Sequence, residues 1–300
     1  RSVIVKHKSI MTSPVIVRSA NFHGGLFLLL TLNSQLLPTA GQQAKSNFGW
    51  EDSLFINSFK DASWPDGLIW YDIDPHLSPR VISAINYAVN YVNKYPNLCV
   101  MWLQRYPYKF DSSITSFVSF VRYKDNPSKH LCATHLNRIK GRQQPLFLGD
   151  YCVKDLIDEV KYPLFLETAI LHEMSHKMGL RHEHQRPDRD CFIYIDRYRV
   201  AEFVKVQGNQ YPSGFPYDYN SIVHYESDDD KTFHAHDNVR RILGRNNGTF
   251  SALDAHKIGH LYCGRKSYCA EQNNCASFYD FAKTNQRCWR KGPDYPTSFP

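Results

Sequence analysis

Four histidines lie within thirteen residues in the segment HEMSHKMGLRHEH, which runs from His172 to His184. His172 and His176 are four residues apart, so on a helix their side chains lie on one face, one above the other. Two imidazoles arranged in this way can bind one ion through ring nitrogens, and neutral imidazole is a common nitrogen ligand of Zn²⁺. The spacing therefore predicts a metal site that begins on a helix.

Three further residues extend this site. Glu173 is turned about 100° around the helix from His172, so it can reach a water on the metal without becoming a ligand. Gly179 can adopt the positive φ that ends a helix, and His182 can then approach the same ion from another direction. Three nitrogens from two directions leave one position open, which is typical of a catalytic zinc site, whereas a structural site would need four protein ligands. We expect one Zn²⁺ per chain.

The alternative interpretation is an amphipathic helix that carries histidines by chance. A bare H-E-x-x-H string is only moderately specific, but Gly179 and His182 at their offsets make coincidence negligible. His184 falls outside the pattern, and we expect it on the surface or behind the ligands.

The elements that position this site are one strand and one helix, then three more strands, and then the helix that carries the motif. Runs rich in β-branched and aromatic residues predict strands, and apolar residues at helical spacing predict helices. The expected strands are Leu68–Ile73, Cys99–Arg105, Ser116–Arg122 and Pro145–Cys152, and the expected helices are Arg80–Tyr95 and Leu166–Leu180.

Composition limits the class of protein. The 300 residues are 42% hydrophobic and 22% charged, which is ordinary for a globular chain that buries a core. The 36 basic and 29 acidic residues give a net charge of +7. These charges are scattered and form no basic and aromatic platform, which argues against nucleic acid as a partner.

The amino-terminal region resembles a secretory signal. The first methionine is Met11, and Arg18, the apolar run 26–32 and the small residues of 38–41 follow it. This order of charge, apolar run and small residues predicts cleavage near Gly41, and the run is too short to span a bilayer. The alternative, a buried core helix, fits less well because the run precedes every other periodic element. We expect a secreted, extracellular protein without a membrane span.

Cysteines and a glycosylation sequon agree with secretion. Eight cysteines favour an oxidising compartment and up to four disulfides. The sequon at Asn247–Thr249 is usable, whereas Asn126 is followed by a proline.

The full string H-E-x-x-H-x-x-G-x-x-H resembles the metzincin metalloproteases. Within that superfamily, HEHQRPDRD resembles the extended signature of the astacin family, and YDYNSIVHY resembles its S-x-M-H-Y turn. GRQQPLFL is similar to the strand that borders its cleft, and FSALDAHKIGHLYC is similar to its closing segment. These segments are 182–190, 217–225, 141–148 and 250–263.

The resemblance implies an α+β, metzincin-type catalytic domain. It would contain a mixed twisted sheet, an active-site helix above the cleft, a loop-rich lower subdomain and a short cysteine-rich carboxyl-terminal tail. We expect upstream residues and a signal peptide over 1–41, a short amino-terminal or pro-segment over 42–60, the catalytic domain over 61–263 and the tail over 264–300.

The resemblance also implies the reaction, which is hydrolysis of peptide bonds in proteins by a secreted, monomeric zinc endopeptidase. Glu173 would take a proton from the zinc-bound water and pass it to the leaving amine. Tyr225 would bind the zinc at rest and then hydrogen-bond the substrate oxyanion. Glu183 would anchor the mature amino terminus. The zinc ligands would be His172, His176 and His182, with Tyr225 as the fourth.

The same resemblance pairs Cys132 with Cys152 and Cys99 with Cys263. The remaining even set, which allows two more bridges in any pairing, is Cys191, Cys269, Cys275 and Cys288.

The chain departs from the family pattern at several places. Val223 replaces the usual methionine of the turn, a position that in the family forms an apolar floor beneath the histidines. Because valine is shorter than methionine, we expect a looser site. The charged segment Val153–Leu164 looks inserted and helical, and it could form a flap near the cleft. Phe48–Asp52 is a poor match to the inhibitory aspartate motif of the family. Val223 and the inserted segment support a rival hypothesis, a weakened zinc protein that binds a partner, although every expected ligand is present.

Overall fold

The computed structural model describes residues 59–105, 113–122, 132–149, 164–195, 203–206, 210–212, 214–226, 233–235, 243–244 and 247–272. The chain divides into two units, Arg1–Gln42 and Gln43–Pro300, and every described residue belongs to the second unit. The expected signal sequence and the motif at Phe48–Asp52 therefore lie outside the described residues.

A five-stranded mixed sheet has the strand order β2-β1-β3-β5-β4. The first four of these strands are parallel, and only β4 runs antiparallel, against β5 at one edge. This arrangement confirms the expected α+β fold with a mixed sheet. The strands are β1 (Leu68–Ile73), β2 (Met101–Gln104), β3 (Phe117–Arg122), β4 (Ala133–Thr134) and β5 (Gln143–Leu148).

Strand β5 begins two residues before the expected start at Pro145 and ends at Leu148. The early residue Gln144 is buried although it is polar, so hydropathy gives no signal for it. Its side-chain amide donates to the carbonyl of Ile139 at 3.2 Å, which explains how a polar group is accommodated in the core.

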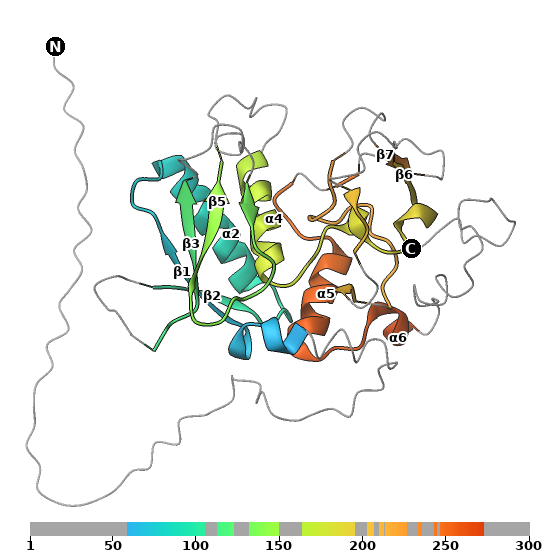
Figure 1. Ribbon diagram of the computed structural model, residues 1–300, viewed down its shortest axis with the longest axis horizontal. Coiled ribbons are helices and arrows are strands. Elements are labelled where there is room, and N and C mark those ends of the chain that lie inside the picture. The colour runs from blue at the N-terminus through green and yellow to red at the C-terminus, as the bar shows by residue number, and fades with distance from the viewer. Residues whose placement is uncertain are drawn as a thin grey trace, which may run out of the picture. The chain divides into compact units, whose positions relative to one another are not determined.

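Helix α2 (Pro79–Lys94) packs against helix α4 (Phe165–Lys177), and Figure 1 shows both helices beside the sheet. Ser78 caps α2 by accepting from the amide of Val81, and Pro79 occupies the first turn, where no amide donor is needed. One face of α2 is buried through residues at spacings of three and four, namely Val81, Ala84, Ile85, Ala88, Val89 and Val92.

The half of the molecule beyond α4 has less regular structure. Helix α5 (Ala252–Cys263) and the short α6 (Tyr268–Gln272) lie there with a two-stranded antiparallel ribbon of β6 (Ile193–Ile195) and β7 (Phe233–Ala235), as Figure 1 shows. The 3₁₀ helices η3 (Glu183–Gln185) and η4 (Arg189–Cys191) also follow α4, whereas η1 (Pro65–Gly67) precedes β1. No helix among the described residues is long and apolar enough to cross a bilayer.

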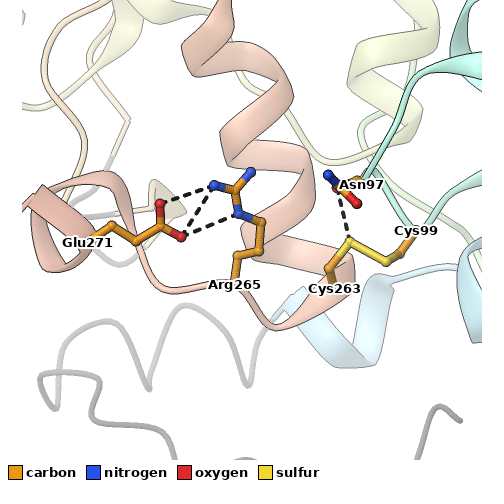
Figure 2. Close-up of a disulfide and its surroundings, with 5 residues drawn as sticks. All are labelled: Asn97, Cys99, Cys263, Arg265 and Glu271. Atoms are coloured by element: carbon orange, nitrogen blue, oxygen red, sulfur yellow. Dashed lines mark hydrogen bonds and ion pairs between the residues drawn. A yellow bond between two sulfur atoms is a disulfide. The ribbon is translucent and has the colours of Figure 1, made fainter. Parts of the chain in front are cut away.

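A disulfide joins Cys99, just before β2, to Cys263, the last residue of α5 (Figure 2). Close to it, Arg265 forms an ion pair of 3.1 Å with Glu271 of α6, which holds the first residues after α5 against the domain. Three more described cysteines are also in disulfides, namely Cys132, Cys191 and Cys269, whereas Cys152, Cys275 and Cys288 lie outside the described residues.

Candidate metal centre

The Nε2 atoms of His172, His176 and His182 form a triangle in which each pair lies 3.1 Å apart. These three are the potential metal ligands that come close enough for one ion in the described part of the chain. A tetrahedral Zn²⁺ with Zn–N bonds of about 2.0–2.1 Å separates its nitrogens by about 3.3 Å. The three imidazoles therefore fit this ion, and the fourth corner is left to another group.

Backbone carbonyls set the orientation of two of the imidazoles. The Nδ1 atom of His172 donates to the carbonyl of Ile222 at 2.7 Å, and the Nδ1 atom of His176 donates to the carbonyl of Leu180 at 2.7 Å. Because a carbonyl can only accept, the proton of each ring is on Nδ1 and the lone pair is on Nε2. Each Nε2 is therefore ready to bind a metal.

The site keeps these rings neutral. Burial lowers the pKa of His172 to about 4 and that of His176 to about 3, and it lowers the pKa of His182 well below the usual value. Neighbouring histidines lower the pKa values of His176 and His182 further. A metal binds the neutral imidazole, so near pH 7 no proton has to leave these nitrogens first.

Gly179 brings the third histidine into place. Its φ is +100°, and its amide donates to the carbonyl of His176 at 3.0 Å as the helix ends. A Cβ atom at this position would overlap the ring of Phe59 and would lie 3.0 Å from Oδ1 of Asn137. The position therefore needs glycine for two reasons, the backbone conformation and the close packing.

Glu173 lies on the buried side of α4 next to His172. Burial raises the pKa of Glu173 to about 8, while Lys177 and a hydrogen bond to the backbone of Thr134 lower it in part. The contact with Thr134 places this carboxyl group between α4 and the edge strand β4. Lys177 is itself buried and donates to Oε1 of Gln144 at 3.1 Å.

The turn at Asp218–Tyr225 forms the floor of the site. Val223, the residue in the place of the usual methionine, is 1% exposed and belongs to the main core. Its carbonyl accepts from the amide of Glu183 at 3.2 Å, so the turn is hydrogen-bonded to the residue that follows His182. Valine thus occupies the position of the usual methionine as a buried apolar residue.

Tyr225 lies against the ligands. Its ring centroid is 4.6 Å from that of His182 and 4.2 Å from that of His184. His184 is completely buried, which excludes the expected alternative of a surface histidine and places it behind His182 and Tyr225. Burial, together with the nearby His224 and Arg189, lowers the pKa of His184 well below its usual value.

Glu183 is the centre of a buried cluster of charges. Its carboxylate pairs with Lys257 at 2.6 Å and with Arg186 at 3.1 Å, and it also accepts from the hydroxyl of Tyr211. Burial alone would raise the pKa of Glu183, but Lys257 and Arg186 reverse the effect and lower it to about 2. Arg186 forms a second, two-bonded pair with Asp188, which braces the loop that follows His182.

Sequence reasoning missed two members of this cluster, Lys257 and Tyr211. They lie 74 and 28 residues from Glu183 in the chain, and neither belongs to the histidine motif. The sequence carries no clear signal for Lys257, because a lysine on a helix is ordinarily exposed and the residues of α5 from Asp254 to Leu261 are all buried.

Some expected features fall on residues outside the described part of the chain. Cys152, and with it the pairing with Cys132, is among them. So is the inserted segment except for Leu164, which has a φ of +68° and precedes α4. The structure therefore leaves the role of that segment as an expectation.

Comparisons with known proteins agree on one family. The sequence model of the peptidase family described as Astacin matches residues 56–263. Zinc metalloproteinase nas-12 of Caenorhabditis elegans is 28% identical over 261 residues, which is 79% of this chain and 60% of the relative. Zinc metalloproteinase nas-7 of the same organism is 32% identical over 55% of this chain and 38% of the relative. The chain thus spans less than two thirds of either relative.

A solved structure supports the fold. High choriolytic enzyme 1, a hatching enzyme zinc-protease from Oryzias latipes, superposes with a TM-score of 0.52 at 24% identity. The match covers 69% of this chain and 96% of that protein. This likeness confirms the expected metzincin-type fold class.

Proposed function

Because the chain belongs to the astacin family of zinc metallopeptidases, we propose that it is a secreted endopeptidase that hydrolyses peptide bonds of proteins with one Zn²⁺. The triangle of Nε2 atoms, 3.1 Å on each side, is the observation that carries the proposal, and the tautomers of His172 and His176 are fixed by carbonyl acceptors. His172, His176 and His182 would hold the ion, and Tyr225 would be the fourth ligand at rest.

When bound, a zinc ion in such a site lowers the pKa of a coordinated water and polarises the scissile carbonyl group. Glu173 is the general base in this proposal: its carboxylate takes the proton of the attacking water and then gives it to the departing amine. Its place on α4 supports the role, since it follows a ligand in the chain but points around the helix from it. The backbone of Thr134 restrains the carboxyl group.

Tyr225 stabilises the oxyanion that forms on the substrate carbonyl oxygen when water attacks the carbonyl carbon. Its ring is tilted by 59° against His182 and stays partly exposed, so the phenol lies next to the ligands and can be reached from outside. A hydroxyl that hydrogen-bonds developing negative charge is a common source of rate enhancement.

The remaining parts of the proposal concern processing and compartment. We assign a signal peptide to residues 1–41, an amino-terminal segment to 42–60, the catalytic domain to 61–263 and the tail to 264–300. The disulfide of Cys99 with Cys263 supports an oxidising, extracellular location. Asn247 is exposed, as a glycosylated residue must be. We also propose that Cys132 pairs with Cys152 and that the protein acts as a monomer.

Replacement of the general base tests the proposal. Zinc-loaded chain with Glu173→Gln is expected to keep stoichiometric zinc, measured by atomic emission, but to lose cleavage of denatured casein by a factor of about 10² or more. Asp61→Asn, at an exposed position, is the matched control and should cleave normally. The chelator 1,10-phenanthroline should abolish the activity of the unaltered chain.

Two outcomes would reject the assignment. One is a zinc-loaded, unaltered chain that fails to cleave casein after removal of the residues before 55, which would favour the partner-binding alternative. The other is a Glu173→Gln chain that cleaves as fast as the control.

A further inference from the structure

The carboxylate of Glu183 has every acceptor position filled from within the chain. Oε1 accepts from Arg186 at 3.1 Å and from the amide of Asp218 at 2.9 Å. Oε2 accepts from Lys257 at 2.6 Å and from the hydroxyl of Tyr211. An ionised carboxylate offers about four lone-pair positions, so no further donor can reach it without displacing one of these groups.

The charges of this cluster are also balanced internally. Arg186 pairs with Asp188 at 2.8 Å as well as with Glu183. Lys257 pairs with Glu183, and both side chains are at most 1% exposed. In a buried cluster an added cation would need an unpaired anion, and Glu183 provides none.

Glu183 is coupled to the metal ligands through the backbone. It follows His182 directly, and its amide donates to the carbonyl of Val223 at 3.2 Å. The one-turn helix η3 begins at Glu183, and within it the amide of Gln185 donates to the carbonyl of His182 at 3.1 Å. A change in the position of the Glu183 carboxylate therefore moves the backbone that carries the third imidazole.

We propose that Lys257 is a positioning residue for the metal centre, and that its ammonium group supplies from within the chain the cation that fixes Glu183 beside His182. The metal centre therefore does not need a free α-amino terminus paired with Glu183. The family resemblance, by contrast, implies that Glu183 anchors such a terminus. This inference rests on the proposed function only where activity is measured. The visible spectrum of the cobalt-loaded protein reports on the geometry of the site independently of activity.

Helix α5 is built to hold the ammonium group in place. Its first turn has a capping box in which Ser251 and Asp254 satisfy each other's backbone donors. Its last residue, Cys263, is fixed by the disulfide to Cys99. Lys257 lies between these two fixed ends, and the hydroxyl of Tyr211 also lies 3.3 Å from its Nζ atom.

The first test removes the ammonium group. Lys257→Ala, loaded with Co²⁺ in place of zinc, is expected to show shifted visible absorption bands and at least about tenfold weaker metal binding, as when other groups that orient metal ligands are lost. With zinc, kcat should fall at least about tenfold while KM changes by less than about twofold. Lys266→Ala, an exposed lysine of the same region, is the matched control and should behave as the unaltered chain.

Chemical rescue separates positioning from a general loss of structure. Propylammonium has the three carbons and the nitrogen that Lys257→Ala lacks, so it should restore the cobalt spectrum and the kcat, whereas neutral propanol should restore neither. An unchanged cobalt spectrum in Lys257→Ala, or equal rescue by propanol, would overturn the proposal.

The second test uses the unaltered chain and so does not depend on the folding of a variant. Transamination with pyridoxal phosphate converts the α-amine of the secreted protein into a ketone and leaves lysines intact. The cobalt spectrum and the rate of casein cleavage should stay the same, and a change in either would show that the terminus is required. If the unaltered zinc protein cleaves no casein, the proposed function fails, while the cobalt spectra still decide the role of Lys257.

Discussion

The Nδ1 atom of His172 donates a hydrogen bond of 2.7 Å to the carbonyl of Ile222, which lies fifty residues further along the chain. The amide of Ile222 in turn donates to Oδ2 of Asp254 at 2.7 Å, and the hydroxyl of Ser221 donates to Oδ1 of Asp254 at 2.6 Å. One buried carboxylate on α5 therefore holds the turn whose carbonyl orients the first ligand.

Substitution Asp254→Asn should weaken zinc binding. Asparagine has one acceptor oxygen, so it can no longer accept from the Ser221 hydroxyl as well as from the amides of Ile222 and Ser251, and the turn that orients His172 loses a restraint. We expect the dissociation constant for zinc, measured by competition with a chelator, to rise about 10-fold to 100-fold. Asp61→Asn, at an exposed position, is the control. An unchanged constant would show that the turn is held by other contacts.

Substitution Gly179→Ala should destabilise the protein by more than backbone strain alone. The left-handed conformation costs an alanine about 1–2 kcal/mol, and the overlap with Phe59 adds about 1–3 kcal/mol. Gly141→Ala serves as the control, because Gly141 has a φ of +70° and no atom within 4 Å of the added Cβ. Urea unfolding should show the larger loss for Gly179→Ala, and equal losses would contradict the role given to packing.

Asp218 should make stability fall as the pH rises. Burial, and then the charge of Asp254, raises the pKa of Asp218 from 3.8 to about 7. The folded state therefore keeps a proton that the unfolded state loses, so this stability is complete below about pH 3.8 and is lost as the pH rises through about 7.

The variant Asp218→Asn should remove this pH dependence. Its free energy of unfolding should equal that of the unaltered chain near pH 4 and exceed it above pH 7, by at most about 4 kcal/mol. Urea titrations of metal-free protein at several pH values measure the difference, in which the titration of groups remote from Asp218 cancels. A constant difference across this range would contradict the raised pKa.

Removal of the disulfide should lower stability strongly. Cys99 and Cys263 are 164 residues apart, so their bond restricts most of the domain in the unfolded state. The double variant Cys99→Ser, Cys263→Ser should lose about 3–5 kcal/mol, measured by urea unfolding. A loss below about 1 kcal/mol would indicate that other contacts restrict the unfolded chain equally.

Local sequence patterns predict the helices and strands well where buried residues recur at a regular spacing. Helix α2 matched the expected Arg80–Tyr95 within one residue at each end, because its buried residues recur at spacings of three and four. The ligand-bearing helix was found from its histidines and from Gly179, whose φ of +100° is a local backbone requirement. Strand β4 was missed, since two residues are too few to show a period.

The contacts that orient the ligands could not be predicted from the sequence. The acceptor for His172 is a backbone carbonyl, which every residue has, so no residue type marks Ile222. The ion pair of Glu183 with Lys257 joins positions 74 residues apart, and a lysine on a helix is ordinarily exposed. Such pairings depend on how α5 packs against the turn, which is a property of the whole fold.

The capping box of α5 couples the ordering of that helix to occupancy of the metal centre. Asp254 accepts from the amides of both Ser251 and Ile222 with the same oxygen, so fraying of the helix start loosens the turn behind His172. A metal ion favours the conformation of the turn in which the Ile222 carbonyl orients His172. By thermodynamic reciprocity, the ion must then also suppress fraying of the first turn of α5. Amide hydrogens in the first turn of α5 should therefore exchange with deuterium more slowly once zinc is added, although none of them contacts the ion.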